Sequence, residues 1–240
     1  MIKYLNIYYW IRKITVNSFF SKFLNQRLLN KIIFNSIYKS NHWNKSSKFD
    51  QKHQSYSGPG SIPDSIQTNT LIYALEIFFE KNGIKKILDA PCGDCAWIQK
   101  IFNKQFEYTG IDIVKDLIDK NKVKFKTYKN INFYCQDLTN YNNFNDYDFI
   151  LLRDFFIHLP INIINKILIN LKKSNCKYFA FNSYESILIN KEITTGQHRK
   201  INFLKSPFYL DEPYFKIQEV KNENFPDKKN QDNYIYIYKN

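Results

Sequence analysis

Apolar residues recur along this chain of 240 residues with two different spacings. Between residues 86 and 182, short apolar runs alternate with stretches in which an apolar residue returns every three or four positions. A short apolar run bounded by turn residues predicts a buried strand, and the longer spacing predicts a helix. The strands are predicted at 86–90, 108–113, 132–136, 147–153, 178–182, 214–220 and 234–238, and the helices between them at 96–102, 114–124 and 161–171.

The alternation of strands and helices predicts how the strands pair. A strand, a helix and a further strand form a right-handed crossover between parallel neighbours, so the repeated unit predicts an α/β fold. The run at 147–153, YDFILLR, is apolar enough to be a central strand covered on both faces. We therefore expect a doubly wound, mostly parallel sheet of seven strands, with a helical extension at the N-terminus.

The chain is predicted to divide into a basic helical extension and linker at 1–56 and a domain at 57–240. An apolar stripe in the extension has roughly helical spacing, and we expect most of it to pack on the domain or on a second subunit. A helix lying on a membrane surface is the less favoured use. The polar stretch at 41–64 is predicted to be a loop, and a helical pattern at 71–79 ends near Gly83. The stripe consists of Phe20, Phe23, Leu24, Leu28, Ile32, Phe34 and Ile37.

The net charge of +13 is concentrated at the start of the chain, where nine cations and no acidic residue precede Asp50. Such an arm suits nucleic acid or an anionic membrane surface, but a solvated helix in a lysine-rich chain is the favoured interpretation. No run reaches the ~18 uncharged apolar residues of a membrane span. Neither a signal-peptide pattern nor a disulfide framework is present, so the chain is predicted to be cytoplasmic.

The segment ILDAPCGDC contains a Cys-x-x-Cys pair, Cys92 and Cys95. A redox pair favours nearby cations or a helix N-terminus, whereas Asp94 lies between these two thiols. A zinc site would need two further ligands, and neither Cys135 nor Cys176 belongs to a second close pair. We interpret Cys92 and Cys95 as packing residues and predict no metal.

Acidic residues follow four successive predicted strands. Asp89 ends the first strand, Asp112 ends the second, and Asp137 and Asp154 follow the third and fourth. The carboxyl ends of parallel strands meet at one edge of the sheet, which is where such sheets bind ligands. Any one of these acids could be a turn or cap residue. Four of them at four successive strand ends favour a binding site.

The chemistry at these positions suits an adenosine derivative without phosphate. Gly93 lets a ligand approach the backbone. An acid about 20 residues further on, here Asp112, accepts the ribose hydroxyls, and Asp137 can accept the adenine amino group. A dinucleotide would need a glycine-rich first loop, whereas DAPCGDC has one glycine and a second acid that repels phosphate. A cationic ligand without phosphate fits better, and S-adenosylmethionine is such a ligand.

These motifs resemble those of class I S-adenosylmethionine-dependent methyltransferases, over about residues 57–182. ILDAPCGDC resembles their first motif, Asp/Glu-x-Gly-x-Gly-x-Gly, with Pro91 and Cys95 in place of two glycines. GIDIV, CQDL and LLRDFFIHLP resemble the later motifs. A narrower likeness is to bacterial methyltransferase-domain proteins with SGPGS, D-x-PCGD-x-x-W and RD-x-x-x-H, and with a late Gly-x-x-Arg-x-x-Asn-Leu segment, here GQHRKINF. The resemblance implies a Rossmann-like fold and an enzyme that uses S-adenosylmethionine.

The resemblance also implies roles for individual residues. Asp89 and Gly93 would hold the methionine end of the cofactor, Asp112 would hold the ribose, and Asp137 with its neighbour would hold the adenine. Asp154 would line the reactive mouth. The implied cofactor-binding residues are Asp89, Ala90, Gly93, Asp112, Ile113, Asp137, Leu138 and Arg153.

Asp154 and His158 are the candidates for removing a proton from the acceptor, because they lie i, i+4 apart if a helix begins immediately. The alternative, which we weigh equally, is that His158 caps the turn before Pro160. From the resemblance, Arg199 and Asn202 are expected to contact the substrate.

The residues after the fourth strand indicate the class of acceptor. Amino-directed nucleic-acid methyltransferases carry Asn/Asp-Pro-Pro-aromatic there, and cytosine C5 enzymes carry a nucleophilic Pro-Cys, whereas this chain has RDFF. A small-molecule, sugar or glycan/lipid-linked hydroxyl is therefore the leading expectation. The alternatives are an RNA methyltransferase that grips phosphates with the basic arm, and a non-catalytic cofactor-binding or scaffold subunit.

Overall fold

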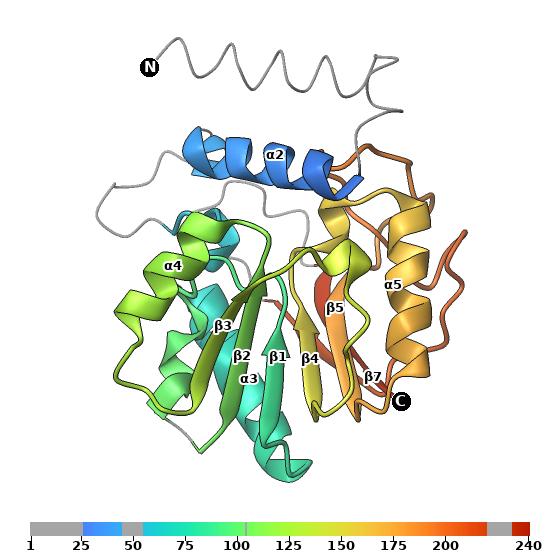
Figure 1. Ribbon diagram of the computed structural model, residues 1–240. Coiled ribbons are helices and arrows are strands. Elements are labelled where there is room, and N and C mark those ends of the chain that lie inside the picture. Colours follow the sequence, from blue (N-terminus) through green and yellow to red (C-terminus); the bar gives the residue numbers. More distant parts are fainter. Residues whose placement is uncertain (1–25, 45–54, 104, 220–231) are drawn as a thin grey trace.

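The computed structural model describes residues 26–44, 55–103, 105–219 and 232–240. At its centre is a seven-stranded sheet in the order β3-β2-β1-β4-β5-β7-β6 (Figure 1). The predicted α/β sheet, doubly wound and mostly parallel, is confirmed. Its strands are β1 Lys86–Asp89, β2 Glu107–Asp112, β3 Ile131–Cys135, β4 Phe149–Leu152, β5 Tyr178–Tyr184, β6 Phe215–Gln218 and β7 Asn233–Lys239.

The order of the strands creates a binding edge. β1 pairs in parallel with both β2 and β4, and β3 and β5 extend the parallel part on either side. β7 runs antiparallel to both β5 and β6. The chain leaves β1 toward β2 and β3 and then returns to β4 on the other side of β1. Ligands of open α/β sheets bind beyond the strand ends at such a reversal.

Four α-helices lie in the described residues, and short 3-10 turns connect several strands. α3 begins earlier than the predicted 71–79 helix, because the Ser65 hydroxyl accepts the Thr68 backbone N–H at 3.2 Å and caps the first turn. Gly83, with a φ of +62, follows its C-terminal end as predicted. The helices are α2 Gln26–Lys39, α3 Ile66–Lys81, α4 Lys115–Lys124 and α5 Ile161–Lys173.

The segment predicted to be helical at 96–102 forms a short 3-10 helix and no α-helix. It spans Ile98–Asn103, and the chain enters it from Cys95, whose φ is +52. Trp97 and Ile98 are both buried beside this entry.

The helix α2 lies across the end of the sheet at which β1 and β2 finish (Figure 1). Its buried face carries Leu29, Ile33 and Ile37, which join the same apolar core as the sheet. At the first turn of α2 the buried position is Leu29, whereas the predicted position, Leu28, is 48% exposed. Phe20, Phe23 and Leu24 lie outside the described residues. The boundary between residues 56 and 57 stays a prediction.

The two faces of the sheet pack into separate apolar clusters. Along β1, Leu88 points into the cluster that contains α5 and α2, and Ile87 points into the cluster that contains α3. This alternation follows from the two-residue period of a strand. Both β4 and β5 are buried along their whole length, as predicted for central strands. None of the described helices is long and apolar enough to cross a bilayer.

Candidate functional site

The loop after β1 is shaped by a glycine that no other residue could replace without strain. Gly93 has a φ of +54, and a Cβ atom there would lie 2.1 Å from the Ser57 hydroxyl oxygen. The Asn121 side-chain amide donates to the Gly93 carbonyl at 2.8 Å and ties the loop to α4. The loop after β1 is therefore held against the SGPGS segment and against α4.

Asp94, the second acid of this loop, ties it to a distant segment. Its carboxylate accepts the Ser55 hydroxyl at 2.9 Å, the Tyr56 backbone N–H at 2.7 Å and the Ser57 hydroxyl at 3.2 Å. From the sequence, Asp94 was expected only to repel phosphate. The structure adds a positioning contact that brings residues 55–57 over the loop.

Asp112, at the end of β2, is almost fully buried and has two backbone partners. Its carboxylate accepts the Gly93 N–H at 3.0 Å and the Val114 N–H at 2.9 Å. Burial raises the pKa of Asp112 to about 6, although these N–H groups act in the opposite direction. Asp112 is therefore ionised near neutral pH and joins the first loop to the second.

Asp137, after β3, is held by its own turn and by α2. Its carboxylate accepts the Thr139 N–H at 3.0 Å and the Thr139 hydroxyl at 2.8 Å. The Asn30 side-chain amide donates to the same carboxylate at 3.3 Å. Asn30 is 1% exposed, so this contact joins the N-terminal helix to the site from within the core.

Asp89, at the end of β1, is buried beside a phenol. The Tyr108 hydroxyl donates to its carboxylate at 2.6 Å. Burial raises the pKa of Asp89 to about 7, against the lowering effects of this hydrogen bond and of Arg153. Ala90, which follows it, is wholly buried and donates its N–H to the Leu151 carbonyl, so Ala90 continues the sheet pairing.

Arg153, at the end of β4, uses its guanidinium within the protein. Its Nε donates to Glu219 at 2.8 Å, its Nη2 donates to the Gly60 carbonyl at 2.8 Å, and the group lies over the Trp97 ring at 4.8 Å. Nη1 lies 3.4 Å from the Asp154 carboxylate. Arg153 thus orients Asp154 and closes the floor of the site.

Asp154 and His158 face the same space, but a helix does not place them. Asp154 has a φ of +54 and donates its N–H to the Asn182 side-chain oxygen at 2.6 Å. The 3-10 turn Phe156–His158 follows. The expected immediate helix is therefore wrong, because a left-handed residue at Asp154 interrupts it.

The His158 imidazole is fixed in one orientation. Its Nδ1–H donates to the Gln197 carbonyl at 2.8 Å, and its ring stacks on Trp43 with 5.2 Å between the ring centroids. Burial lowers the pKa of His158 to about 4, so the ring is neutral near pH 7. The rings of His158 and His198 lie 5.7 Å apart.

Arg199 and Asn202 are placed behind the wall of the site. The Arg199 Nη1 donates to the Leu159 carbonyl at 2.6 Å. The Asn202 side chain is 2% exposed, donates to the carbonyls of Glu185 and Ile187 at 3.1 and 3.0 Å, and accepts the Leu204 N–H at 3.0 Å. These contacts indicate that Asn202 stabilises the conformation of a loop.

Three adjoining cavities meet at this edge of the sheet, and all three are lined by Trp43, Asp154 and His158. The β2–β3 chamber, of about 40 Å³, is lined by Asp112, Ile113, Asp137, Leu138 and Thr139, among others. The β1–β4 chamber, of about 60 Å³, is lined by Asp89, Gly93, Trp97 and Arg153, among others. The four strand-end carboxylates therefore line adjoining cavities at one edge of the sheet, and Asp154 lines both chambers.

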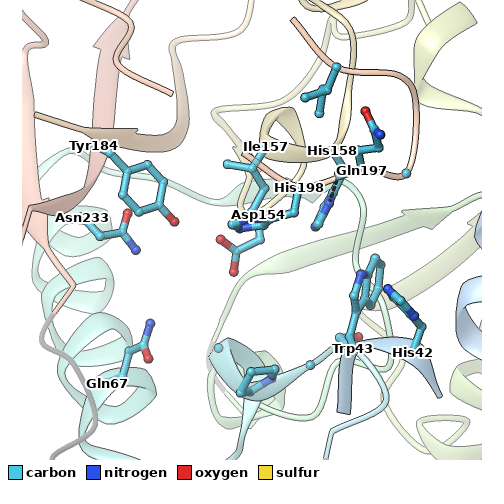
Figure 2. Close-up of a pocket in the computed structure, with 16 residues that line it drawn as sticks. His42, Trp43, Gln67, Asp154, Ile157, His158, Tyr184, Gln197, His198 and Asn233 are labelled. Atoms are coloured by element: carbon cyan, nitrogen blue, oxygen red, sulfur yellow. Dashed lines mark hydrogen bonds between the residues drawn. The ribbon is translucent and has the colours of Figure 1, made fainter. Parts of the chain in front are cut away.

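The third cavity, the large cleft, has a volume of about 710 Å³. Figure 2 shows Asp154 and His198 side by side at its centre, with Tyr184 and Asn233 on one side and Trp43 and His42 on the other. The sequence had pointed to Asp154 and His158 as candidates for proton removal here. The residues of the large cleft that this prediction missed include His42, Trp43, Gln67, Tyr184, His198 and Asn233.

Comparison with known proteins identifies this arrangement. Residues 87–174, which include β1 to β4 and α5, match a family described as a methyltransferase domain. The chain carries a class I S-adenosylmethionine-dependent methyltransferase domain. The protein is accordingly an enzyme that uses S-adenosyl-L-methionine.

Solved structures share the fold of this methyltransferase at low identity. Magnesium protoporphyrin IX methyltransferase (ChlM) from Synechocystis PCC 6803, with bound SAM, is 12% identical, with a TM-score of 0.56 over 89% of this chain and 96% of that chain. The N-methyltransferase NodS from Bradyrhizobium japonicum WM9, in complex with S-adenosyl-L-homocysteine, is 12% identical, with a TM-score of 0.53 over 85% and 97%. The methyltransferase domain of bacterial CtHen1-C is 16% identical, with a TM-score of 0.53 over 72% and 98%. No curated protein matches the sequence.

The two small chambers of this methyltransferase suit its cofactor in charge. Four carboxylates line them, against one guanidinium that is already paired with Glu219. Such a space attracts a cation and repels phosphate. The loop at Gly93 leaves no room for a Cβ, so the backbone itself forms part of the wall. Among the described residues, no group of three His, Cys, Asp or Glu side chains could hold a metal ion.

Proposed function

We propose that this methyltransferase holds S-adenosylmethionine in the two small chambers and methylates a hydroxyl group of a small, neutral, sugar-like acceptor in the large cleft. One observation carries the proposal. The large cleft shares Asp154 and His158 with both small chambers, and its lining is rich in neutral polar groups but contains neither Lys nor Arg.

The arrangement of the chambers supports the roles that the sequence implied for the cofactor. Asp112 is assigned to the ribose hydroxyls, and Asp137 with Leu138 to the adenine, because these residues share the β2–β3 chamber. Asp89 and Gly93 are assigned to the methionine end, because both line the β1–β4 chamber. Three further residues complete the proposed set. Ile113 lines the β2–β3 chamber, Ala90 continues the sheet beneath it, and Arg153 supports Asp154.

Proton removal is assigned to Asp154. S-adenosylmethionine, when bound, would supply the methyl group, and its sulfur–methyl bond would break to leave neutral S-adenosylhomocysteine. A hydroxyl acceptor must give up its proton as its oxygen forms the new bond to carbon. Asp154 is the carboxylate that faces all three cavities, and its side chain is 33% exposed. His158 also lines all three cavities, and its Nδ1–H is held by the Gln197 carbonyl, so we assign it the placement of the acceptor.

The chemistry of the large cleft favours a polyhydroxylated acceptor. The side-chain amides of Gln67 and Asn233 and the hydroxyl of Tyr184 offer both donors and acceptors (Figure 2). The Trp43 ring provides an apolar face of the kind on which a sugar ring can stack. The volume of about 710 Å³ lies within the usual range of ligand sites.

A nucleic-acid acceptor finds no matching charge in this cleft. Phosphates are bound mainly by Lys and Arg, and none of the residues that line the cleft is of either type. Much of the basic arm that motivated the RNA alternative lies in residues 1–25, outside the described residues. Arg199 is buried behind the cleft, and its contact with substrate stays a prediction. Asn202 is also buried, and we do not include it among the proposed contacts with the acceptor.

The proposal is tested by offering the enzyme S-adenosylmethionine with a panel of monosaccharides, disaccharides and alkyl glycosides, and with small amines and RNA. Mass spectrometry of the products distinguishes a methyl ether from a methylamine. We expect a methyl ether on a glycoside. Asp154→Asn should lower the rate at least about 100-fold while the affinity for S-adenosylhomocysteine stays within about threefold. Methylation of RNA or an amine, with no saccharide accepted, would contradict the proposal.

A further inference from the structure

The segment of residues 26–44, which precedes the matched methyltransferase domain, forms part of the wall of every cavity in the site. Phe34, Tyr38 and Trp43 line the β2–β3 chamber. Tyr38 and Trp43 also line the β1–β4 chamber, and Trp43 lines the large cleft as well. The two small chambers therefore lie between the strand ends on one side and this segment on the other.

The segment is attached to the site through groups that belong to the cofactor chambers. Asn30 donates to Asp137 at 3.3 Å and to Thr139 at 3.1 Å. The Tyr38 hydroxyl lies 3.3 Å from the Ser57 hydroxyl. The Trp43 ring meets the Tyr38 ring edge-on, with 5.0 Å between centroids, and stacks on His158. Each of these partners is itself a lining residue of a cavity.

The two chambers are small for a nucleoside-sized ligand. They have volumes of about 40 and 60 Å³, whereas sites for small molecules usually have about 300–1,000 Å³. β1, β2 and β4 are interior strands of the sheet, and the residues at their carboxyl ends are buried, so the sheet side is held in place. Trp43 and Tyr38, by contrast, are only partly buried. Admission of a nucleoside-sized cofactor therefore requires residues 26–44 to shift outward.

The same segment reaches the large cleft through close packing. A Cβ on Gly196 would lie 2.6 Å from Ile33 and 3.3 Å from Ile37, so α2 lies directly on the loop that carries His198. That loop is joined to the turn after β4 by the hydrogen bond from the Gly196 N–H to the His158 carbonyl at 2.9 Å. A displacement of α2 would thus move one wall of the large cleft together with the cover of the chambers.

We propose that Tyr38 and Trp43 are cofactor-contacting residues on a movable wall, residues 26–44, which opens to admit S-adenosylmethionine and closes over it. In the closed arrangement Trp43 stacks on His158 and completes one wall of the large cleft, so opening of the segment would also disturb the acceptor site. The proposal concerns the cofactor alone and holds for any class of acceptor, so it is independent of the proposed hydroxyl specificity.

S-adenosylhomocysteine is the probe for this proposal, with calorimetry for its affinity and stopped-flow fluorescence for its dissociation rate. Trp43→Ala removes the cover, and Trp43→Phe keeps an aromatic ring at the same place. Leu28→Ala is the matched control, because this side chain lies on α2 in the same segment and is 48% exposed. All variants are first compared with wild type by circular dichroism.

We expect Trp43→Ala to weaken S-adenosylhomocysteine binding at least about tenfold, mainly through faster dissociation. Trp43→Phe should stay within about threefold of wild type, and Leu28→Ala should not change. A folded Trp43→Ala variant with wild-type affinity and dissociation rate overturns the proposal. Hydrogen exchange on the wild-type protein gives a second test that needs no variant. Amides of residues 26–44 should gain protection when S-adenosylhomocysteine saturates the enzyme, and unchanged protection there also overturns the proposal.

Discussion

Alanine at position 93 tests the close packing that shapes the cofactor chambers. Gly93 has a φ of +54, and a Cβ there would lie 2.1 Å from the Ser57 hydroxyl oxygen. Gly83 has a similar φ of +62, but an added Cβ would meet no heavy atom within 4 Å. Gly83→Ala therefore measures the backbone strain alone, and Gly93→Ala measures the same strain together with the steric conflict.

The structure sets the expected size of each effect. A non-glycine residue in the left-handed region costs roughly 1–2 kcal/mol, and an extra carbon in a packed site costs about 1–3 kcal/mol. Ser57 cannot yield freely, because its hydroxyl accepts the Asp94 N–H at 3.1 Å. We expect Gly83→Ala to lower the free energy of unfolding by about 1 kcal/mol and Gly93→Ala to lower it by about 2–4 kcal/mol.

Urea unfolding of the two variants measures these losses, and calorimetry with S-adenosylhomocysteine measures the effect on the site. The Gly93 N–H donates to Asp112 at 3.0 Å, so displacement of the loop should weaken binding at least about tenfold in Gly93→Ala only. Ser57→Gly added to Gly93→Ala should restore part of the lost affinity. Equal stability losses in the two single variants, with cofactor affinity unchanged in both, would refute the reasoning.

Three further predictions concern charge and loop structure. Burial raises the pKa of Asp89 to about 7 and that of Asp112 to about 6, above the ordinary value of 3.8. The folded state then binds more protons than the unfolded state, so this contribution to stability is complete below about pH 4 and is lost as the pH rises through 6 to 7. Urea unfolding between about pH 5 and pH 8 should show a fall in the free energy of unfolding, and Asp112→Asn should make this fall shallower. A pH dependence that Asp112→Asn leaves unchanged would exclude the assignment. Asp94→Ala, which leaves the donors of residues 55–57 without their acceptor, should cost about 1.5–3 kcal/mol and speed proteolysis of that segment; wild-type resistance to protease would count against the tether. Asn202→Ala should lower Tm while the affinity for S-adenosylhomocysteine stays unchanged, and a loss of affinity at unchanged Tm would return Asn202 to the binding site.

The sequence alone was sufficient for the sheet and for the first residues of the site. Periods of two and 3.6 residues are local properties of strands and helices, so the pattern located every strand of the sheet to within a few residues. Asp89, Asp112, Asp137 and Asp154 follow successive strands, and parallel strands place their carboxyl ends at one edge. Their convergence on adjoining cavities followed from chain order.

Other features depended on contacts between distant segments. The buried face of α2 was predicted one position out of place at its start, because Asn30 is drawn into the core by Asp137, more than a hundred residues away. The predicted helix at 96–102 became a 3-10 turn, because packing against the sheet outweighed a short helical pattern.

The large cleft is the feature that only the tertiary structure could reveal. Gln67 lies on α3, Tyr184 on β5, His198 on a late loop and Asn233 on β7, and no spacing in the sequence connects them. The position of β7 between β5 and β6 brings Asn233 to this edge. Local patterns determine which elements form, because backbone geometry repeats over a few residues. The order in which the sheet assembles, and the way α2 closes over it, depend on burial of apolar surface across the whole chain, and these determine which polar side chains share a cavity.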